Sequence, residues 1–192
     1  MQIITYPHPT LRHKSKPIRR VDAELRALIR EMFTLMYAAK GIGLAANQVD
    51  LPLRLFIINL KSDPKDGEEM VFINPVISLP KGSAEDEEGC LSLPGLYSQV
   101  IRPKQVRVNA YSLDGKELVA DVGGMLARCV QHEYDHLDGV LFTDRLSPSA
   151  RIEVADELDE FETDFHSRRS TGGIPSDEQI AAQWAVWEQK YG

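Results

Sequence analysis

The stretch QHEYDHLDG, residues 131–139, contains two histidines that are four positions apart, His132 and His136. On an α-helix, side chains with this spacing leave the same face about one turn apart. Both imidazoles can therefore bind one metal ion, with Glu133 beside the open coordination position as a general acid/base. The alternative is a surface helix with two incidental histidines. The pattern favours a metal-assisted hydrolase organised around this helix.

Catalytic zinc-type sites normally combine three protein ligands with water, so a third ligand is needed. The metzincin pattern would require a histidine where the chain has Phe142. Glu153 and Glu157 follow at distances that suit a thermolysin-like ligand, but a solvated acidic helix face explains them equally well. A better candidate is Cys90, within EEGCLS at 87–92, because a thiolate binds borderline-soft divalent ions strongly.

The alternative for Cys90 is the common one for a single cysteine, a small buried hydrophobe. It follows four clustered acids at 85–88, which disfavour an unmetallated thiolate, and a bound cation would remove that conflict. Cys129 lies three residues before His132 on the same helix. We interpret Cys129 as a packing residue near the site.

A glycine-rich segment, GIGLAANQ at 41–48, precedes both motifs. Glycines allow a backbone to approach a ligand closely. The segment lacks the GxxxxGK[ST] pattern of a P-loop and the third glycine of a dinucleotide-binding fingerprint. A helix C-terminus in which Gly41 serves as the cap is the alternative interpretation.

Together, GxGLAAxQ at 41–48, EGCLS at 88–92 and QHExDH at 131–136 resemble the motifs of peptide deformylases, which have them in this order. The resemblance covers about residues 1–150. It implies that the chain removes the N-formyl group from the methionine of newly synthesised polypeptides, a step of N-terminal processing in protein biosynthesis that releases formate.

The resemblance also implies roles for individual residues. Glu133 is the general base, and Gln48 forms the oxyanion hole with the backbone N–H of Leu91. The metal ligands are Cys90, His132 and His136, with water in the fourth position. The active metal is predicted to be Fe²⁺, although Zn²⁺ or Ni²⁺ can be found bound in such enzymes.

The formyl-methionyl peptide is expected to bind as an extended strand by β-augmentation. The residues predicted to line its path are Ile42, Gly43, Leu44, Gly89 and Leu91. The residues predicted to surround the methionine are Glu88, Leu126, Cys129 and the ring of His132. Asp135 is a candidate partner for a ligand histidine, and Arg102 or Arg128 could pair with Glu88.

The remaining patterns predict an α+β fold, with mixed or antiparallel strands around the central HExxH helix and outer helices at both ends. Asp22 caps a first helix that ends at Gly41. Strands are expected at 54–60, 70–79, 106–111 and 117–121, and the central helix at about 124–137. A non-catalytic binding module could share this fold.

We expect a catalytic domain at 1–147 and an acidic helical extension at 148–192. A helix begins at Pro148 and a linker rich in glycine and proline follows at 168–175. On a last helix an aromatic stripe contains Ile180, Trp184, Trp187 and Tyr191. This stripe is expected to pack onto the body; the alternative is a docking face for a second subunit or another protein.

The distribution of charge along the chain limits which partners it can bind. Residues 151–192 contain ten acidic and four basic side chains, which leaves 19 acids and 18 bases elsewhere. Some deformylases are thought to reach nascent chains through a basic C-terminal helix that docks on the ribosome. The phosphates of ribosomal RNA would repel this acidic extension. A transient contact with the ribosome would therefore need another surface of the protein. Direct DNA binding is not expected.

Composition agrees with a cytoplasmic enzyme. No apolar run approaches the 18 residues of a membrane span, and the N-terminus lacks the apolar region of a signal peptide. Two cysteines imply no disulfide framework. A zinc-type endopeptidase, in which Cys90 is dispensable, and a catalytically inactive deformylase-like binding module are the alternatives to a deformylase.

Overall fold

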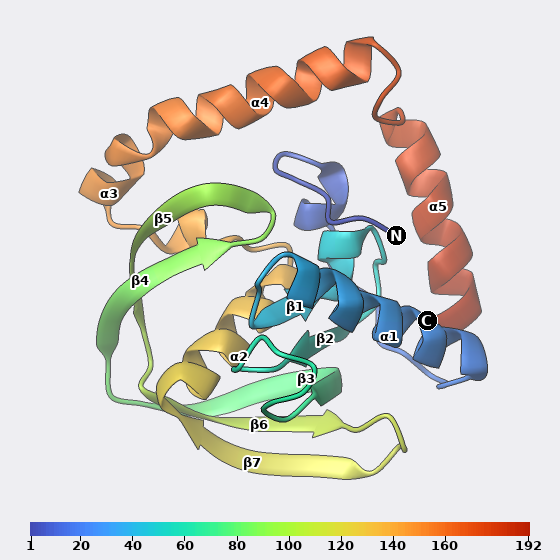
Figure 1. Ribbon diagram of the computed structural model, residues 1–192, viewed down its shortest axis with the longest axis vertical. Coiled ribbons are helices and arrows are strands. Elements are labelled where there is room, and N and C mark those ends of the chain that lie inside the picture. The colour runs from blue at the N-terminus through green and yellow to red at the C-terminus, as the bar shows by residue number, and fades with distance from the viewer.

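The computed structural model describes residues 1–192, and its centre is an antiparallel sheet of five strands in the order β1-β2-β3-β6-β7 (Figure 1). These strands are β1 (Gly43–Ala45), β2 (Leu55–Ile58), β3 (Met70–Lys81), β6 (Gln105–Tyr111) and β7 (Glu117–Gly123). A separate hairpin is formed by β4 (Ala84–Cys90) and β5 (Leu93–Arg102). The predicted α+β class is confirmed.

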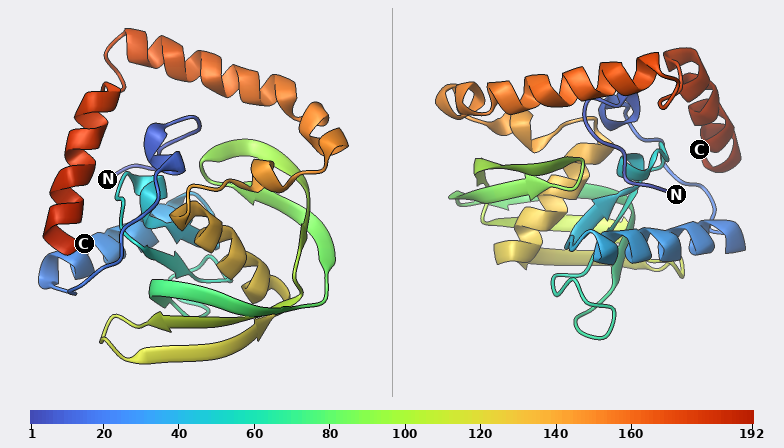
Figure 2. Two further views of the ribbon diagram at one scale, coloured as in Figure 1. Left: turned by 180° about the vertical axis from the view of Figure 1, so that it is seen from behind. Right: turned by 45° about the horizontal axis from the view of Figure 1, so that its top comes forward.

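Helix α2 (Gly124–Leu137) lies between the sheet and the β4–β5 hairpin (Figures 1 and 2). Its apolar face, with Ala127 and Val130, belongs to one buried cluster with Phe56 and Phe72 of the sheet. The rings of these two phenylalanines stack with their centroids 4.8 Å apart. Burial of this face holds the helix in place and aims the other face, with both histidines, towards the hairpin.

Helix α1 (Ala23–Ala38) covers the β1 side of the sheet. Asp22 caps it as predicted, since its side chain accepts the Leu25 N–H at 2.9 Å. Its buried side chains recur at helical spacing: Leu25, Ile29, Met32, Phe33 and Met36. These residues form a second buried cluster with β1 and β2.

The end of α1 differs from the prediction. The helix ends at Ala38 rather than Gly41, and the left-handed residue is Lys40, with φ of 55°. Gly41 is needed for a different reason, because a Cβ at this position would lie 2.6 Å from Leu91 Cδ1. The glycine therefore allows the chain to pass close to the EGCLS segment.

Short 3₁₀ helices connect the larger elements: η1 (Pro9–Arg12), η2 (Ala46–Val49) and η3 (Phe142–Arg145). Beyond them lie α3 (Pro148–Glu153), α4 (Ala155–Ser170) and α5 (Asp177–Tyr191). The helix expected from Pro148 is interrupted at Val154, whose side chain is buried. Figures 1 and 2 show α4 along the outside of the molecule and α5 descending beside α1.

The aromatic stripe of α5 faces the body. Ile180 and Tyr191 are fully buried. The Trp184 indole stacks on His13 with ring centroids 4.1 Å apart and donates its N–H to the Thr10 hydroxyl at 2.9 Å. The stripe thus packs as the first of the two alternatives predicted, and a second subunit could use it only if α5 left this position.

None of the helices is long and apolar enough to cross a membrane.

Candidate metal centre

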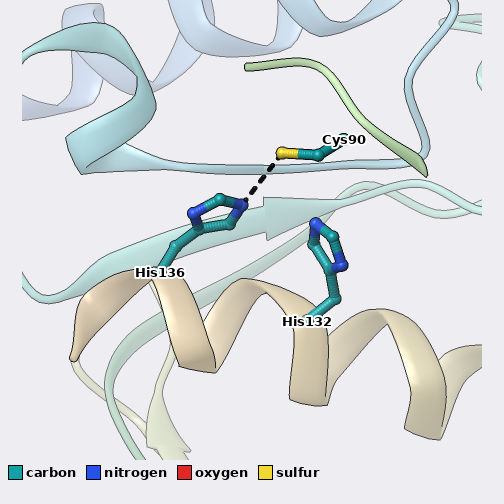
Figure 3. A group of neighbouring side chains, drawn as sticks. All are labelled: Cys90, His132 and His136. Carbon is teal, nitrogen blue, oxygen red and sulfur yellow. Dashed lines mark hydrogen bonds between the residues drawn. The ribbon is translucent and has the colours of Figure 1, made fainter. Parts of the chain in front are cut away.

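Two elements bring three potential metal ligands together. Cys90 ends β4, whereas His132 and His136 extend from one face of α2 (Figure 3). One ligand atom from each residue lies within 4.8 Å of the others. The sequence separates Cys90 from the histidines by more than forty residues, and the hairpin closes this gap over the helix.

The donor set fits a divalent metal ion. Cys90 Sγ lies 3.3 Å from His136 Nε2. A thiolate and an imidazole on one tetrahedral zinc-type ion lie about 3.5 Å apart. Burial holds the pKa of His136 well below its usual range, which favours the neutral imidazole that binds metals. Burial also lowers the pKa of His132, but Cys90 and Glu88 outweigh it and raise this pKa to about 10.

Glu88 orients His132. Its Oε2 lies 3.0 Å from His132 Nδ1, which leaves Nε2 of that ring free for a metal. Both candidate arginines pair with this carboxylate: Arg102 donates to it twice, at 2.6 and 2.9 Å, and Arg128 donates at 2.6 Å. Burial would raise the pKa of Glu88, but the bonds from His132 and Arg102 outweigh it and lower the pKa to about 2.

Asp135 serves the same network from the other side of Arg102. Its carboxylate accepts from Arg102 at 2.8 Å and pairs with Arg145. It therefore supports the arginine that holds Glu88, and no hydrogen bond links it to a ligand histidine. The buried ion pairs Asp135–Arg102–Glu88 connect the hairpin to α2 directly beneath the site.

Replacement of Arg102 by leucine is expected to lower the free energy of unfolding by about 3 kcal/mol, because it removes the shared partner of two buried carboxylates. Arg107→Leu is the control, since Arg107 pairs with Asp121 at the solvent-exposed surface of β6 and β7 and should matter much less. Urea unfolding of the metal-loaded proteins measures both. Equal losses in the two variants would contradict the structural importance of the buried network.

Glu133 lies against the glycine-rich segment. It is 4% exposed, and its Oε2 has no hydrogen-bond partner in the protein. Burial raises its pKa to about 7, against the lowering effect of the His132 and Arg102 charges. A carboxyl group poised near neutral pH is suited to accept and return a proton. Gly43 provides the space, because a Cβ there would lie 2.5 Å from Glu133 Oε1.

Gln48 presents an N–H group to the site. Its Oε1 accepts the Ala45 N–H at 2.8 Å, which fixes the orientation of the amide. Its Nε2 consequently faces Cys90 Sγ at 3.4 Å and Ser92 Oγ at 3.3 Å. A buried donor held in this way is arranged before any substrate binds, as an oxyanion site requires.

A cleft of about 570 Å³ opens beside these residues. The predicted substrate residues that line it are Ile42, Gly43, Glu88, Gly89, Leu91, Cys129 and His132. Two others do not line it: Leu44 is fully buried in the cluster beneath α1, and Leu126 packs against the cluster between α2 and the sheet. The substrate roles of all these residues stay predictions.

Several cleft residues lie outside the three motifs, among them Lys40, Tyr97 and Met125. Tyr97 pairs with Gly89 across the β4–β5 hairpin, and its ring occupies the place that a Cβ at position 89 would need. The contact between Tyr97 and Gly89 follows from the register of the β4–β5 hairpin. The sequence alone does not give this register.

Comparison with known proteins identifies the family. A family model described as polypeptide deformylase matches residues 1–151. A peptide deformylase of Rhodopirellula baltica is 49% identical over 191 residues, covering 100% of this chain and 95% of the relative. Peptide deformylase 1B of Arabidopsis thaliana, named as chloroplastic/mitochondrial, is 38% identical over 184 residues, covering 95% of this chain and 66% of the relative.

Solved structures agree. A crystal structure of plant peptide deformylase 1B superposes with a TM-score of 0.86 at 39% identity, covering 92% of this chain and 95% of that one. A peptide deformylase from Legionella pneumophila gives a TM-score of 0.78 at 41% identity, covering 91% and 98%. The chain belongs to the peptide deformylase family of metal-dependent hydrolases, which remove the formyl group from N-terminal methionine.

Proposed function

We propose that this chain deformylates nascent peptides at a single divalent metal ion held by Cys90, His132 and His136. The observation that carries this assignment is the convergence of three ligand atoms within 4.8 Å, beside the cleft. The unpartnered Oε2 of Glu133 supports it, because a buried carboxylate oxygen without a donor suits a group that takes a proton from water.

The bound ion supplies Lewis-acid activation and lowers the pKa of water towards neutrality. Glu133 accepts the proton of the attacking water and later returns it to the leaving amine. Gln48 Nε2 and the Leu91 N–H donate to the oxygen that becomes negative as the formyl carbon is attacked. The products are formate and a peptide with a free amino terminus.

The peptide is proposed to bind in the cleft as an extended strand along Gly43 and Gly89. Both glycines lie where a side chain would collide, with Glu133 at the first and Tyr97 at the second. Close approach of a substrate backbone therefore depends on them. Glu88 lines the cleft, but its carboxylate is hydrogen-bonded to His132, Arg102 and Arg128. We therefore propose that Glu88 orients His132 and does not contact the methionine.

The experiment that tests this function uses a peptide that has both a formyl-methionyl end and internal peptide bonds. Mass spectrometry of the products separates loss of the formyl group from internal cleavage. Deformylation with intact internal bonds is the expected result. Internal cleavage of the formylated peptide would favour the endopeptidase alternative, and no reaction by the metal-loaded protein would favour the binding module.

Fe²⁺ is the proposed active metal. Protein loaded with Fe²⁺ under anaerobic conditions is expected to release formate faster than protein loaded with Zn²⁺, and exposure to air should remove the difference as the iron oxidises. A Cys/His₂ set accepts both ions, so the rates distinguish them where the ligands do not. Equal or faster turnover with zinc would contradict this choice.

Replacement of Gln48 by alanine is expected to lower kcat by about 10²–10³ without loss of the metal, because one preformed oxyanion donor disappears. Gln48→Glu should be at least as damaging, since it replaces the donor by a negative charge. Formate release and metal content are measured for each variant. If Gln48→Ala keeps the parent's kcat, the proposed role of Gln48 as an oxyanion donor is wrong.

Residues 148–192 are proposed to be an extension that α5 anchors to the catalytic domain. Its exposed acidic surface on α4 argues against ribosome docking through these helices. The cytoplasm stays the predicted compartment.

A further inference from the structure

The second ring nitrogen of His136 is buried and has no hydrogen-bond partner in the protein. Nε2 of this ring faces Cys90 Sγ, so a neutral His136 that binds a metal through Nε2 has its hydrogen on Nδ1. At His132 the equivalent nitrogen has Glu88 as its partner. The two ligands therefore differ, and His136 needs an acceptor from another residue.

Asn47 contacts His136 and contains an acceptor without a partner. Its side chain is fully buried, and its Nδ2 donates to the backbone carbonyl of His136. Its Oδ1 accepts nothing in the protein. Ser15 adds another such atom, its hydroxyl oxygen, and its N–H donates to the Leu137 carbonyl at 2.9 Å.

Ser15 and Asn47 both donate to backbone carbonyls in the last turn of α2. Five buried side-chain polar atoms of the chain lack a partner, and three of them are on His136, in the last turn of α2, and on Ser15 and Asn47, which donate to carbonyls of that turn. Unpaired buried polar groups are rare in native proteins. Unpaired acceptors on two residues that contact the turn of an unpaired donor therefore indicate that a water completes their hydrogen bonds.

We propose that Asn47 is a positioning residue for His136, a role that rests on the metal site proposed above. Its Oδ1 accepts the Nδ1 hydrogen of His136 through a bridging water that the Ser15 hydroxyl can share, while its Nδ2 holds the His136 carbonyl. This partnership fixes the tautomer and the ring orientation of the ligand. The 3₁₀ turn η2 thus supplies two amides, Gln48 to the reacting atoms and Asn47 to a ligand.

The test measures metal affinity, which does not depend on turnover. Zn²⁺ affinity is determined by competition with a chromophoric chelator, and Co²⁺-loaded protein reports ligand geometry through its visible absorption. Asn47→Leu is expected to bind Zn²⁺ about 10–100-fold more weakly and to change the Co²⁺ spectrum. Asn47→Asp keeps an acceptor and loses the donor to the carbonyl, so it should retain the parent's Zn²⁺ affinity while losing thermal stability.

Asn59→Leu is the matched control, because Asn59 is equally buried and hydrogen-bonded to the Asp63 and Asp66 carbonyls, away from the ligands. It should lose stability and keep the metal affinity. Parent-like affinity in Asn47→Leu, or equal weakening in Asn47→Asp, would overturn the acceptor role. Weakening in Ser15→Ala but not in Asn47→Leu would also overturn it. Failure of the parent itself to bind metal would instead refute the metal site.

Discussion

Replacement of Glu133 by alanine is expected to leave the metal in place and to lower kcat by about 10²–10⁴, the usual contribution of a positioned general acid/base. The carboxylate does not belong to the ligand set, so its loss should not release the ion. It is buried beside Gly43 and lines the cleft next to the ligand residues, where the proposed general base would have to lie. Formate release and metal content, measured on the same preparation, check both parts.

Glu133→Gln sharpens this test because glutamine keeps the shape of the side chain but cannot accept the proton. It should lose as much turnover as the alanine variant. Glu157→Gln is the matched control, since Glu157 is exposed on α4 and is one of the two thermolysin-like candidates for a ligand, with Glu153. An active Glu133→Gln enzyme, or an inactive Glu157→Gln enzyme, would overturn the assigned roles.

Replacement of Cys90 by alanine is expected to abolish stoichiometric metal binding and, with it, all measurable deformylation. Two histidines on one helix face leave a divalent ion under-coordinated, and the thiolate is the only sulfur ligand within reach of both. Metal content after gel filtration measures the loss. In Co²⁺-loaded protein, the absorption band from the thiolate should disappear.

Cys129→Ala provides the control because it removes the other cysteine, which is buried on the same helix and lines the cleft. The Cys129 variant should keep the metal and the thiolate band. Full metal occupancy in Cys90→Ala would mean that a different third ligand holds the ion, as the endopeptidase alternative requires.

Local patterns predicted the elements best. The central helix is predicted at about 124–137, around the HExxH pentad, and lies at Gly124–Leu137. The Asp22 cap is likewise predictable from the sequence, since it depends on a hydrogen bond between residues only three positions apart. The end of α1 is not, because Gly41 is required by Leu91, a residue fifty positions away whose proximity only the fold creates.

The site shows the same division. The spacing of His132 and His136 predicts a shared face, whereas the approach of Cys90 depends on how the β4–β5 hairpin folds over α2. The sequence left the partner of Glu88 open between Arg102 and Arg128, and the structure uses both. A buried carboxylate has enough acceptor positions for several donors, so the two candidates were never exclusive.

The most direct test of the central claim is formate release from a formyl-methionyl tripeptide by anaerobically prepared, Fe²⁺-loaded protein, with the acetyl-methionyl peptide as the control. The cleft and its oxyanion donors are expected to support rapid release from the formyl peptide and no reaction with the acetyl peptide. No formate from a folded, fully metallated protein, or equal hydrolysis of both peptides, would contradict deformylation as the activity of this chain.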